Sequence, residues 1–204
     1  MKILKFETQD EWLDGRRGKI TGTKAGKLFS KRDKKPLKGY YELIAERVAI
    51  PASGENVMDR GHRLEIDGVV RFEKETGKST NKDLVIMCRD ENDSIAYSPD
   101  AFIEGKKGII TEDVEVKCLN SASHIEAWLT KKVPSEYEDQ IIQGFVVNDK
   151  LETRYMVFYD PRMPIDFFYL TITRKEVEEQ VGNFLEMERK VLLEISEIEK
   201  ELTF

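Results

Sequence analysis

The sequence has few of the residues that build metal clusters, disulfides or histidine-based catalytic sites. Its 204 residues include only two cysteines, Cys88 and Cys118, and two histidines, His62 and His124. Without an export signal, two cysteines are expected to be reduced core thiols rather than a disulfide. Neither histidine has a partner at zinc-ligand spacing, so we expect both to be structural or surface residues.

Several longer patterns are also missing. No apolar run approaches the ~18–20 residues that span a bilayer, and the segment from Met1 to Phe6 is too short and too charged for a signal peptide. We therefore expect a cytoplasmic protein without membrane contact, including one made by a virus inside its host cell. The absence of G-x-S-x-G, Walker-type and G-x-G-x-x-G motifs argues against serine–histidine catalysis and against ATP or dinucleotide binding.

The chain has enough apolar residues for one domain with a real core, but its charge is unevenly distributed. The apolar fraction is 40% and the net charge is −6. Residues 16–38 carry ten lysines and arginines against one acid, whereas residues 174–204 carry five basic residues and nine glutamates. A basic segment on an acidic body is a footprint for a polyanion, although a solvated lysine-rich loop would show the same pattern.

Residue periodicity predicts a single α/β domain over residues 1–204, with a mixed central sheet and helices on both sides. A basic, helical part is expected at about 1–58, the core of the domain at about 59–173 and a C-terminal helix at about 174–202. Helices are predicted at 7–15, 21–29, 40–48, 59–76, 121–130, 135–147 and 174–202, and turns at 51–56 and 160–162. Strands are predicted at 84–89, 95–97, 101–104, 108–118, 154–159 and 167–172.

The most informative pattern is a pair of charged residues inside the apolar strand at 114–118. Side chains on a strand repeat with a period of two, so Glu115 and Lys117 project from one face. Asp100 precedes a short strand that can return beside Glu115. Two carboxylates for Mg²⁺ and one ammonium group for a phosphate or an attacking water suit phosphodiester hydrolysis. The plainer interpretations are a surface strand with alternating charges, and a turn residue at Asp100.

Four more residues are candidates for the same site. Glu65, in a predicted helix, is either a third carboxylate or an exposed helix residue. Gln140 either orients a water or a phosphate or is polar surface. Arg16 and Thr23 combine a bidentate phosphate clamp with a hydroxyl at a predicted helix start, which suits a terminal phosphate. The alternatives for these two are general contact with the DNA backbone and no functional role.

These residues occur in a fixed order along most of the chain. In sequence the motifs are Trp12…Arg16-x-Gly18-x-Ile20-Thr21-x-Thr23, Gly61-x3-Glu65, Phe72-Glu73-x2-Thr76-Gly77, Ser98-Pro99-Asp100, Glu115-x-Lys117-Cys118, Tyr137-x2-Gln140 and Tyr159-Asp160-Pro161-Arg162-Met163. Each motif alone is unspecific, but their joint order and spacing resemble the phage lambda exonuclease (YqaJ-type viral recombinase) family of the PD-(D/E)XK nuclease superfamily.

The resemblance implies a restriction-endonuclease-like core and a 5′–3′ exodeoxyribonuclease that uses Mg²⁺, usually two ions, with Mn²⁺ able to substitute. Such an enzyme degrades the 5′ strand of a linear duplex from 5′-phosphorylated ends, releases mononucleotides and leaves 3′ overhangs for phage-type recombination. It also implies a homo-oligomer, in the best-known member a trimeric ring around DNA, and a single-strand annealing protein as partner.

The same resemblance implies DNA-end binding by the basic part at about 1–58, catalysis by the core at about 59–173, and roles for individual residues. Metal ligands would be Asp100, Glu115, the Val116 carbonyl and Glu65, and Lys117 would position or activate the attacking water. The remaining roles are an accessory one for Gln140 near the metals and 5′-phosphate binding for Arg16 and Thr23.

The chain also departs from the family pattern. Gly22-Thr23 stands where Ala-Ser is common, Leu119 stands where a proline is common, and lysines and arginines are dense between Lys24 and Lys38. Two other functions stay open: a different PD-(D/E)XK nuclease, either an endonuclease or a RecB-like enzyme, and a non-catalytic DNA-end-binding recombination protein. The lack of a four-cysteine pattern argues against the iron–sulfur RecB-like branch.

Overall fold

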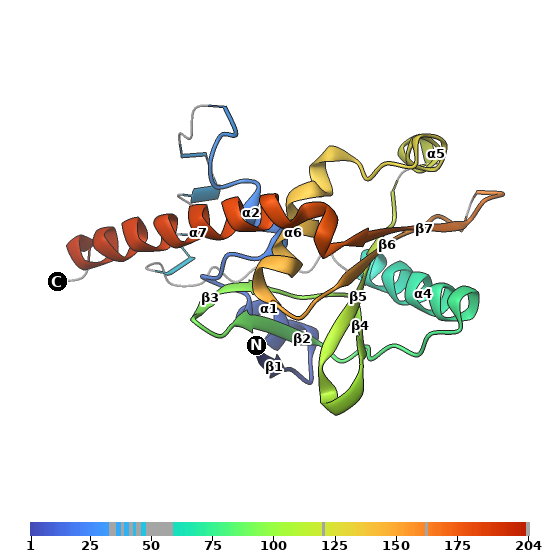
Figure 1. Cartoon of the computed structure of the whole chain (residues 1–204), viewed down its shortest axis with the longest axis horizontal. Helices are drawn as coiled ribbons and strands as arrows, with labels where there is room; N and C mark the ends of the chain where they lie inside the picture. The colour runs from blue at the N-terminus through green and yellow to red at the C-terminus, as the bar shows by residue number, and fades with distance from the viewer. Residues whose placement is uncertain are drawn as a thin grey trace.

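The computed structural model describes residues 1–32, 36–37, 39–40, 43, 46–47, 59–119, 121–161 and 163–202, with the backbone alone at 59–63 and 121–122. Its elements, labelled in Figure 1, are β1 (Lys2–Lys5), α1 (Gln9–Gly15), α2 (Gly22–Ala25), α4 (Asp59–Thr76), β2 (Val85–Arg89), β3 (Asn92–Tyr97), β4 (Ala101–Glu104), η1 (Lys106–Gly108), β5 (Ile110–Lys117), α5 (Ser121–Thr130), η2 (Ser135–Tyr137), α6 (Glu138–Val147), β6 (Thr153–Tyr159), β7 (Phe167–Thr173) and α7 (Arg174–Leu202).

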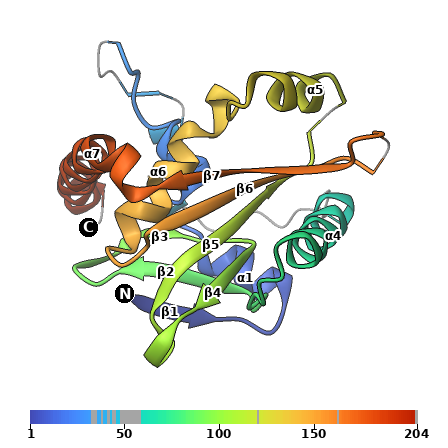
Figure 2. The same ribbon diagram turned by 45° about the vertical axis from the view of Figure 1, so that its right-hand side comes forward.

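The strands form two sheets. Strands β1, β2 and β3 make an antiparallel sheet, and β4, β5, β6 and β7 make a mixed sheet in which only β5 and β6 run parallel. Helix α4 packs on one face of the mixed sheet, and α6 lies on the other, between the sheet and α7 (Figures 1 and 2). The predicted α/β class, with a mixed sheet flanked by helices, is therefore confirmed.

Several helix bounds follow directly from local signals. The helices predicted at 59–76, 121–130 and 174–202 are present with those bounds or close to them. Gly77 ends α4 with a φ of 69°, a left-handed conformation that glycine adopts without strain. Helix α1 begins after Thr8, whose side chain accepts a hydrogen bond from the Glu11 N–H. The helix predicted at 40–48 lies largely outside the described residues, and the turn at 51–56 lies wholly outside them.

Two helix predictions are wrong in detail. The helix predicted at 21–29 ends at Ala25, because the chain turns there to let Phe29 bridge to Pro36. Close packing also fixes the turn, since a Cβ on Gly26 would lie 2.1 Å from the Asp139 Oδ2. The helix predicted at 135–147 begins as the 3₁₀ turn η2 and becomes α-helical only in α6.

Strand β1 was not expected from the sequence. Its four residues are too few to show a period-of-two pattern, and three of them are exposed. Its pairing with β2, in the register Lys2↔Cys88 to Lys5↔Val85, makes it a strand. Tertiary hydrogen bonding, rather than local propensity, therefore decides this element.

The cysteines and the described histidine side chain have structural environments. Both cysteines are free thiols, as predicted, with Cys88 buried and Cys118 partly exposed. His124 is buried, and its Nε2 lies 2.9 Å from the Ile165 carbonyl oxygen. Among the residues described, no helix combines the length and apolar character needed to cross a membrane.

Helix α7 packs through its apolar stripe but also buries an acid. The helical spacing of the sequence predicts this stripe as Val177, Val181, Phe184, Val191, Ile195 and Ile198. Val181, Val191 and Ile195 of the stripe are buried, and its other members pack against the core while partly exposed. Glu188 lies in the same stripe with no exposed surface. Burial raises its pKa to about 8, while the nearby Gln143 amide and the charge of Arg89 oppose the rise. Glu188 is therefore mostly protonated at neutral pH, which avoids the cost of burying its charge.

Replacing Glu188 by glutamine is expected to reduce the pH dependence of stability. Because its pKa rises from 4.5 to about 8 on folding, the stabilisation is complete below pH 4.5 and is lost as pH rises towards 8. Between pH 6 and pH 9 the free energy of unfolding of the wild type should fall by about 2–3 kcal/mol more than that of the variant. Urea titrations at both pH values measure this, with Glu186→Gln on the exposed side of α7 as control. Equal pH slopes for wild type and Glu188→Gln would contradict it.

Candidate active site

Strand β5 sorts its side chains onto two faces. Val114 and Val116 are buried on the α4 side, where a Cβ on Gly68 would lie 2.6 Å from the Val116 Cγ1. Glu115 and Lys117 share the alternate positions, as predicted, and Lys117 Nζ lies 2.7 Å from Glu115 Oε1. The strand therefore places a carboxylate and an ammonium group together at its end, while its apolar face anchors it to α4.

Asp100 reaches this pair from the turn between β3 and β4. The antiparallel register Ala101↔Val114 places the turn beside β5, and the Val116 N–H donates to Asp100 Oδ2 at 2.6 Å. Burial and the charge of Glu115 raise the pKa of Asp100 well above its ordinary value, and Lys117 offsets only part of this. The site thus has an excess of negative charge that a proton or a cation would neutralise.

Lys117 is held as an ammonium group. Burial alone would lower its pKa, but the charges of Glu115 and Asp100 and the hydrogen bond to Glu115 raise it above its ordinary value. The Nζ also lies 5.1 Å from the centre of the Tyr137 ring. Lys117 is therefore suited to donate hydrogen bonds and to stabilise negative charge, rather than to accept a proton.

Gln140 completes this group from α6. Its Nε2 donates a hydrogen bond to Glu115 Oε1, the oxygen that also pairs with Lys117. Helix α2 packs directly on it, since a Cβ on Gly22 would lie 2.8 Å from the Gln140 Cγ. The structure therefore brings Gln140, Glu115 and Lys117 together and places the start of α2 beside them.

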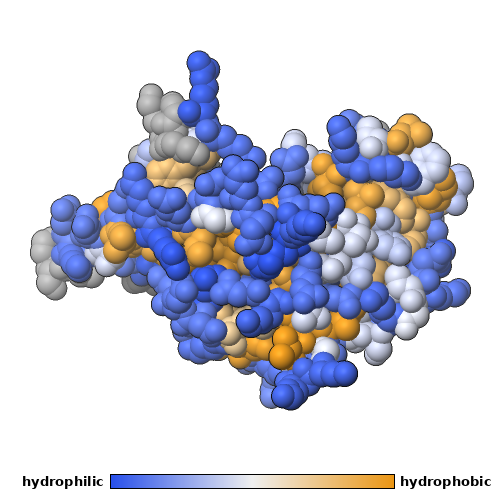
Figure 3. All heavy atoms as spheres, in the orientation of Figure 1, coloured by the Kyte–Doolittle hydropathy of each residue, from blue (hydrophilic) through white to orange (hydrophobic). Residues whose placement is uncertain are grey.

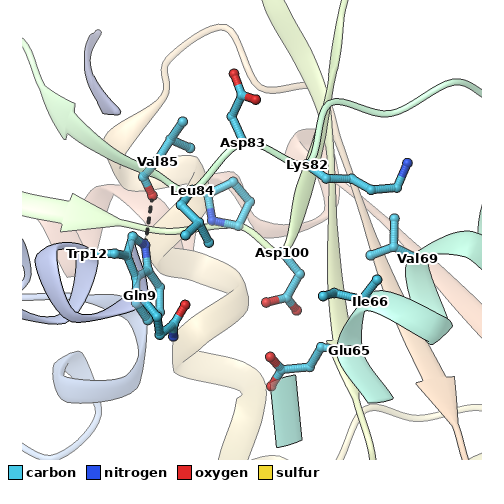
Figure 4. A pocket seen from close by; sticks show the side chains of 11 residues that line it. Gln9, Trp12, Glu65, Ile66, Val69, Lys82, Asp83, Leu84, Val85 and Asp100 are labelled. Atoms are coloured by element: carbon cyan, nitrogen blue, oxygen red, sulfur yellow. Dashed lines mark hydrogen bonds between the residues drawn. The ribbon is translucent and has the colours of Figure 1, made fainter. Parts of the chain in front are cut away.

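Glu65 lies next to Asp100 at one end of a cavity. Figure 4 shows the two carboxylates turned towards one another, and Asp100 interacts electrostatically with Glu65. The cavity has a volume of about 230 Å³. Its walls between α1 and α4 include the apolar side chains of Trp12, Ile66, Val69, Leu84 and Pro99. The site is thus open to a ligand on the side where these two acids lie.

The donor set fits Mg²⁺ in its chemistry but is not a complete protein cage. In the part of the chain that the structure describes, no three Asp, Glu, His or Cys side chains group closely enough to hold a metal ion by themselves. Mg²⁺ keeps several waters and is commonly held by one or two carboxylates together with substrate phosphate oxygens. Asp100 and Glu115 offer that number of carboxylates. A bound cation would offset the repulsion between their negative charges, which favours cation binding.

Arg16 lies beside the same acids, at the end of α1. Its guanidinium stacks on Trp12, with 4.4 Å from Cζ to the ring centre, and its Nη2 donates to Thr21 Oγ1 at 3.5 Å. Burial lowers the pKa of Arg16, and the charges of Glu115 and Asp100 oppose that effect. Arg16 is therefore a partly desolvated cation within electrostatic range of the carboxylates.

The hydroxyl that contacts Arg16 is not the one singled out in the sequence. Thr21 is buried and occupies the N-cap position of α2, although its side chain makes no capping hydrogen bond. Thr23 is exposed and lies further along, within α2 itself. The order of residues alone cannot tell which of two nearby threonines turns towards Arg16.

Two residues of this region were missed in the sequence. Asp113 and Arg154 are fully buried and paired, with Arg154 Nε 2.9 Å from Asp113 Oδ1. The available signal was the same as for Glu115: Asp113 lies two residues earlier on the same strand, and Arg154 interrupts an otherwise apolar strand. Asp113 adjoins the site through Arg154, whose Nη2 lies 3.6 Å from Glu115 Oε2.

Comparison with known proteins adds the family. Residues 11–150 match the YqaJ-like viral recombinase domain, which is more than half of the chain. The chain belongs to the YqaJ-like viral recombinase family. The family resemblance inferred from the motifs is thereby confirmed, and the matched YqaJ-like region contains every candidate site residue.

The YqaJ-like fold is also seen in solved structures. Two crystal structures of LHK-Exo, an alkaline exonuclease from Laribacter hongkongensis, one of them in complex with dAMP, each align with a TM-score of 0.77 at 24% identity. Each alignment covers 95% of this chain and 98% of the other. At this identity the likeness shows a shared fold. No curated protein matches the chain.

Proposed function

We propose that this YqaJ-like protein is a Mg²⁺-dependent exonuclease that degrades the 5′ strand of linear double-stranded DNA from 5′-phosphorylated ends. It would release mononucleotides and leave 3′ overhangs for phage-type recombination. The observation that carries the proposal is the convergence of Asp100, Glu115 and Lys117 at one end of the mixed sheet. The family's recombinase description and the exonuclease activity named for LHK-Exo support the same reaction class.

Each residue has a distinct part in the proposed reaction. Two Mg²⁺ ions would be held by Asp100, Glu115, Glu65 and the Val116 carbonyl. Bound Mg²⁺ supplies positive charge that makes a water more acidic and stabilises the charge on the phosphate and the leaving oxygen. Lys117, an ammonium group 2.7 Å from Glu115, would orient the attacking water and donate to the phosphate.

Two further groups would position the substrate. Gln140, which donates to Glu115, would release that bond to orient a water or a phosphate oxygen. Arg16 would hold the 5′-phosphate together with a hydroxyl from the start of α2. By the family resemblance Thr23 supplies that hydroxyl. The Thr21 hydroxyl, which accepts a hydrogen bond from Arg16, could donate its own proton to the same phosphate.

Cleavage of defined DNA substrates tests the function. With Mg²⁺, linear duplex labelled at one 5′ end should release acid-soluble mononucleotides, whereas closed circular duplex should stay intact. Chelation by EDTA should stop the release, and Mn²⁺ should restore it. Cutting of closed circles would indicate an endonuclease, and binding of ends without release under any divalent cation would indicate a non-catalytic end-binding protein.

Arg16→Ala is expected to remove most of the preference for 5′-phosphorylated ends. Trp12 and Thr21 orient the guanidinium in a desolvated site, so removing this charged phosphate partner should reduce the ratio of rates on 5′-phosphate and 5′-hydroxyl ends by about 10-fold or more. Rates on the two ends of otherwise identical duplexes measure the ratio. Arg71→Ala is a matched control, because Arg71 also stacks on an aromatic ring, that of Phe167, but at the contact between α4 and β7. An unchanged ratio in Arg16→Ala would rule out this phosphate site.

The proposal extends to partners and location. We infer a homo-oligomer, a trimeric ring by family likeness, acting with a single-strand annealing protein in the cytoplasm of a bacterial host. Figure 3 shows an apolar area at the end of the molecule where α5 and β7 lie, which supports a protein-binding surface there. The large apolar side chains exposed at this end are Ile125, Leu129, Ile165 and Tyr169.

A further inference from the structure

A second, fully buried ion pair adjoins Glu115 of the proposed site. Asp113 of β5 and Arg154 of β6 are partners in the parallel register of the two strands, and neither side chain has any exposed surface. Arg154 Nε donates to Asp113 Oδ1 at 2.9 Å. Removing two charges from water at this depth is costly, and a buried ion pair is weak evidence for a purely stabilising role. The Asp113–Arg154 pair is therefore a candidate for a functional role.

The guanidinium of Arg154 joins three parts of the site at once. Besides Asp113, its Nη1 donates to the carbonyl oxygens of Gln140 and Ile141, both at 2.8 Å. Its Nη2 lies 3.6 Å from Glu115 Oε2, the oxygen of Glu115 that faces away from Lys117 and Gln140. Gln140 is thus held by its backbone through Arg154 and by its side chain through Glu115.

Helix α6 is shaped to accept this guanidinium. A Cβ on Gly144 would lie 2.3 Å from Arg154 Nη1 and 2.5 Å from its Cζ, so a side chain at this position would displace the group. The planar fork of arginine can satisfy three separate acceptors in one plane, which the single ammonium group of lysine cannot do. The contact between α6 and β6 is therefore specific for arginine.

We propose, on the basis of the function proposed above, that Arg154 held by Asp113 is a positioning residue for the metal site. Its contact with Oε2 fixes the orientation of the Glu115 carboxylate. Its hydrogen bonds to the Gln140 and Ile141 carbonyls fix the distance of α6 from β6, and therefore the position of Gln140. Without Arg154, Glu115 can rotate about its side-chain bonds, and the buried Asp113 two residues away loses its ion-pair partner. Both effects would lower the affinity for a metal ion, because metal binding depends on a carboxylate held in one orientation.

A double variant separates positioning from folding. Asp113→Val combined with Arg154→Met removes both buried charges and substitutes apolar side chains of similar size, a change that often preserves stability. We expect the double variant to be folded and to show a cooperative thermal unfolding transition. Its Mn²⁺ affinity, measured by electron paramagnetic resonance of free Mn²⁺, should fall by about 10–100-fold. The kcat on linear duplex should fall by a similar factor, and KM for duplex ends should change by less than about 3-fold, since Arg16, the proposed partner of the 5′-phosphate, is untouched.

Arg89→Met is the matched control for removal of a buried arginine. Arg89 also donates to an α6 carbonyl, that of Val146, and pairs with Asp149 at 2.8 Å, but at the far end of the helix. This variant should lose stability and keep wild-type Mn²⁺ affinity. Should the double variant fail to fold, Arg154→Lys carries the test, because it retains the buried charge but not the three-way interaction; it should also weaken Mn²⁺ binding by about 10-fold.

The outcomes distinguish this inference from the proposed function. Wild-type Mn²⁺ affinity and kcat in the folded double variant, or in folded Arg154→Lys, would overturn the positioning role even if the protein cleaves DNA. If the wild type binds Mn²⁺ but releases no nucleotides, the proposed function fails, and the Mn²⁺ titrations alone still decide whether Arg154 orients Glu115.

Discussion

Lys117→Ala is expected to abolish most turnover while leaving DNA ends bound. The ammonium group is held 2.7 Å from Glu115 and stays protonated because Glu115 and Asp100 raise its pKa above its ordinary value. A preorganised donor of this kind typically contributes about 10²–10³-fold to kcat. Single-turnover release of nucleotides from linear duplex measures the effect, and electrophoretic mobility of duplex ends in Ca²⁺ measures binding.

The control for Lys117→Ala is the removal of another lysine from the same chain. Lys150→Ala removes an exposed lysine from the turn after α6 and should leave turnover unchanged. Near wild-type cleavage by Lys117→Ala would show that the ammonium group does not act on the reacting phosphate or water. Loss of end binding together with turnover would instead make Lys117 a DNA contact.

Asp100→Asn is expected to separate activity from stability. Loss of a proposed metal ligand should reduce turnover by about 10³-fold or more, because several kcal/mol of charge stabilisation depend on the cation. Yet the pKa of Asp100 is raised well above its ordinary value by burial and by Glu115, so its stabilisation is greatest at low pH and is lost as pH rises. At pH 8 without metal, the variant should therefore be at least as stable as the wild type.

Melting curves with and without Mg²⁺ check this prediction. Each 1 kcal/mol increase in the free energy of unfolding corresponds to a rise in Tm of about 2–4 °C for a chain of this size. Added Mg²⁺ should raise the Tm of the wild type and leave that of Asp100→Asn nearly unchanged, because only a state that binds the ligand gains stability from it. Asp93→Asn, at an exposed surface pair with Lys2, should alter neither activity nor the Mg²⁺ response. A Mg²⁺-dependent rise in Asp100→Asn equal to that of the wild type would exclude Asp100 as a ligand.

The parts of the site that could be predicted share one property: each follows from local spacing. Glu115 and Lys117 meet because strand side chains alternate, and Asp100 joins them because a short hairpin places β4 beside β5. The ends of α4 and α7 follow from a glycine stop and from apolar periodicity. These are interactions over a few residues, or over one turn of chain, and their geometry is set by the backbone.

The parts that could not be predicted depend on long-range packing. Arg154 and Asp113 lie 41 positions apart and meet only because β5 and β6 pair in parallel through the intervening helices. Glu188 reads as one of nine glutamates on a charged helix, and only the packing of α7 shows that it is buried. Whether Thr21 or Thr23 faces Arg16 depends on how α2 lies against Gln140.

The sequence by itself determined the fold class, the family and the charged residues of the candidate site, since motif order and strand alternation can be observed along the chain. Only the tertiary structure decided which oxygens and nitrogens meet, how deeply they are buried and therefore how far the pKa values of Asp100 and Lys117 move. Those quantities depend on distances between segments and on exclusion of water. Neither exists until α4, α6 and the mixed sheet have packed together.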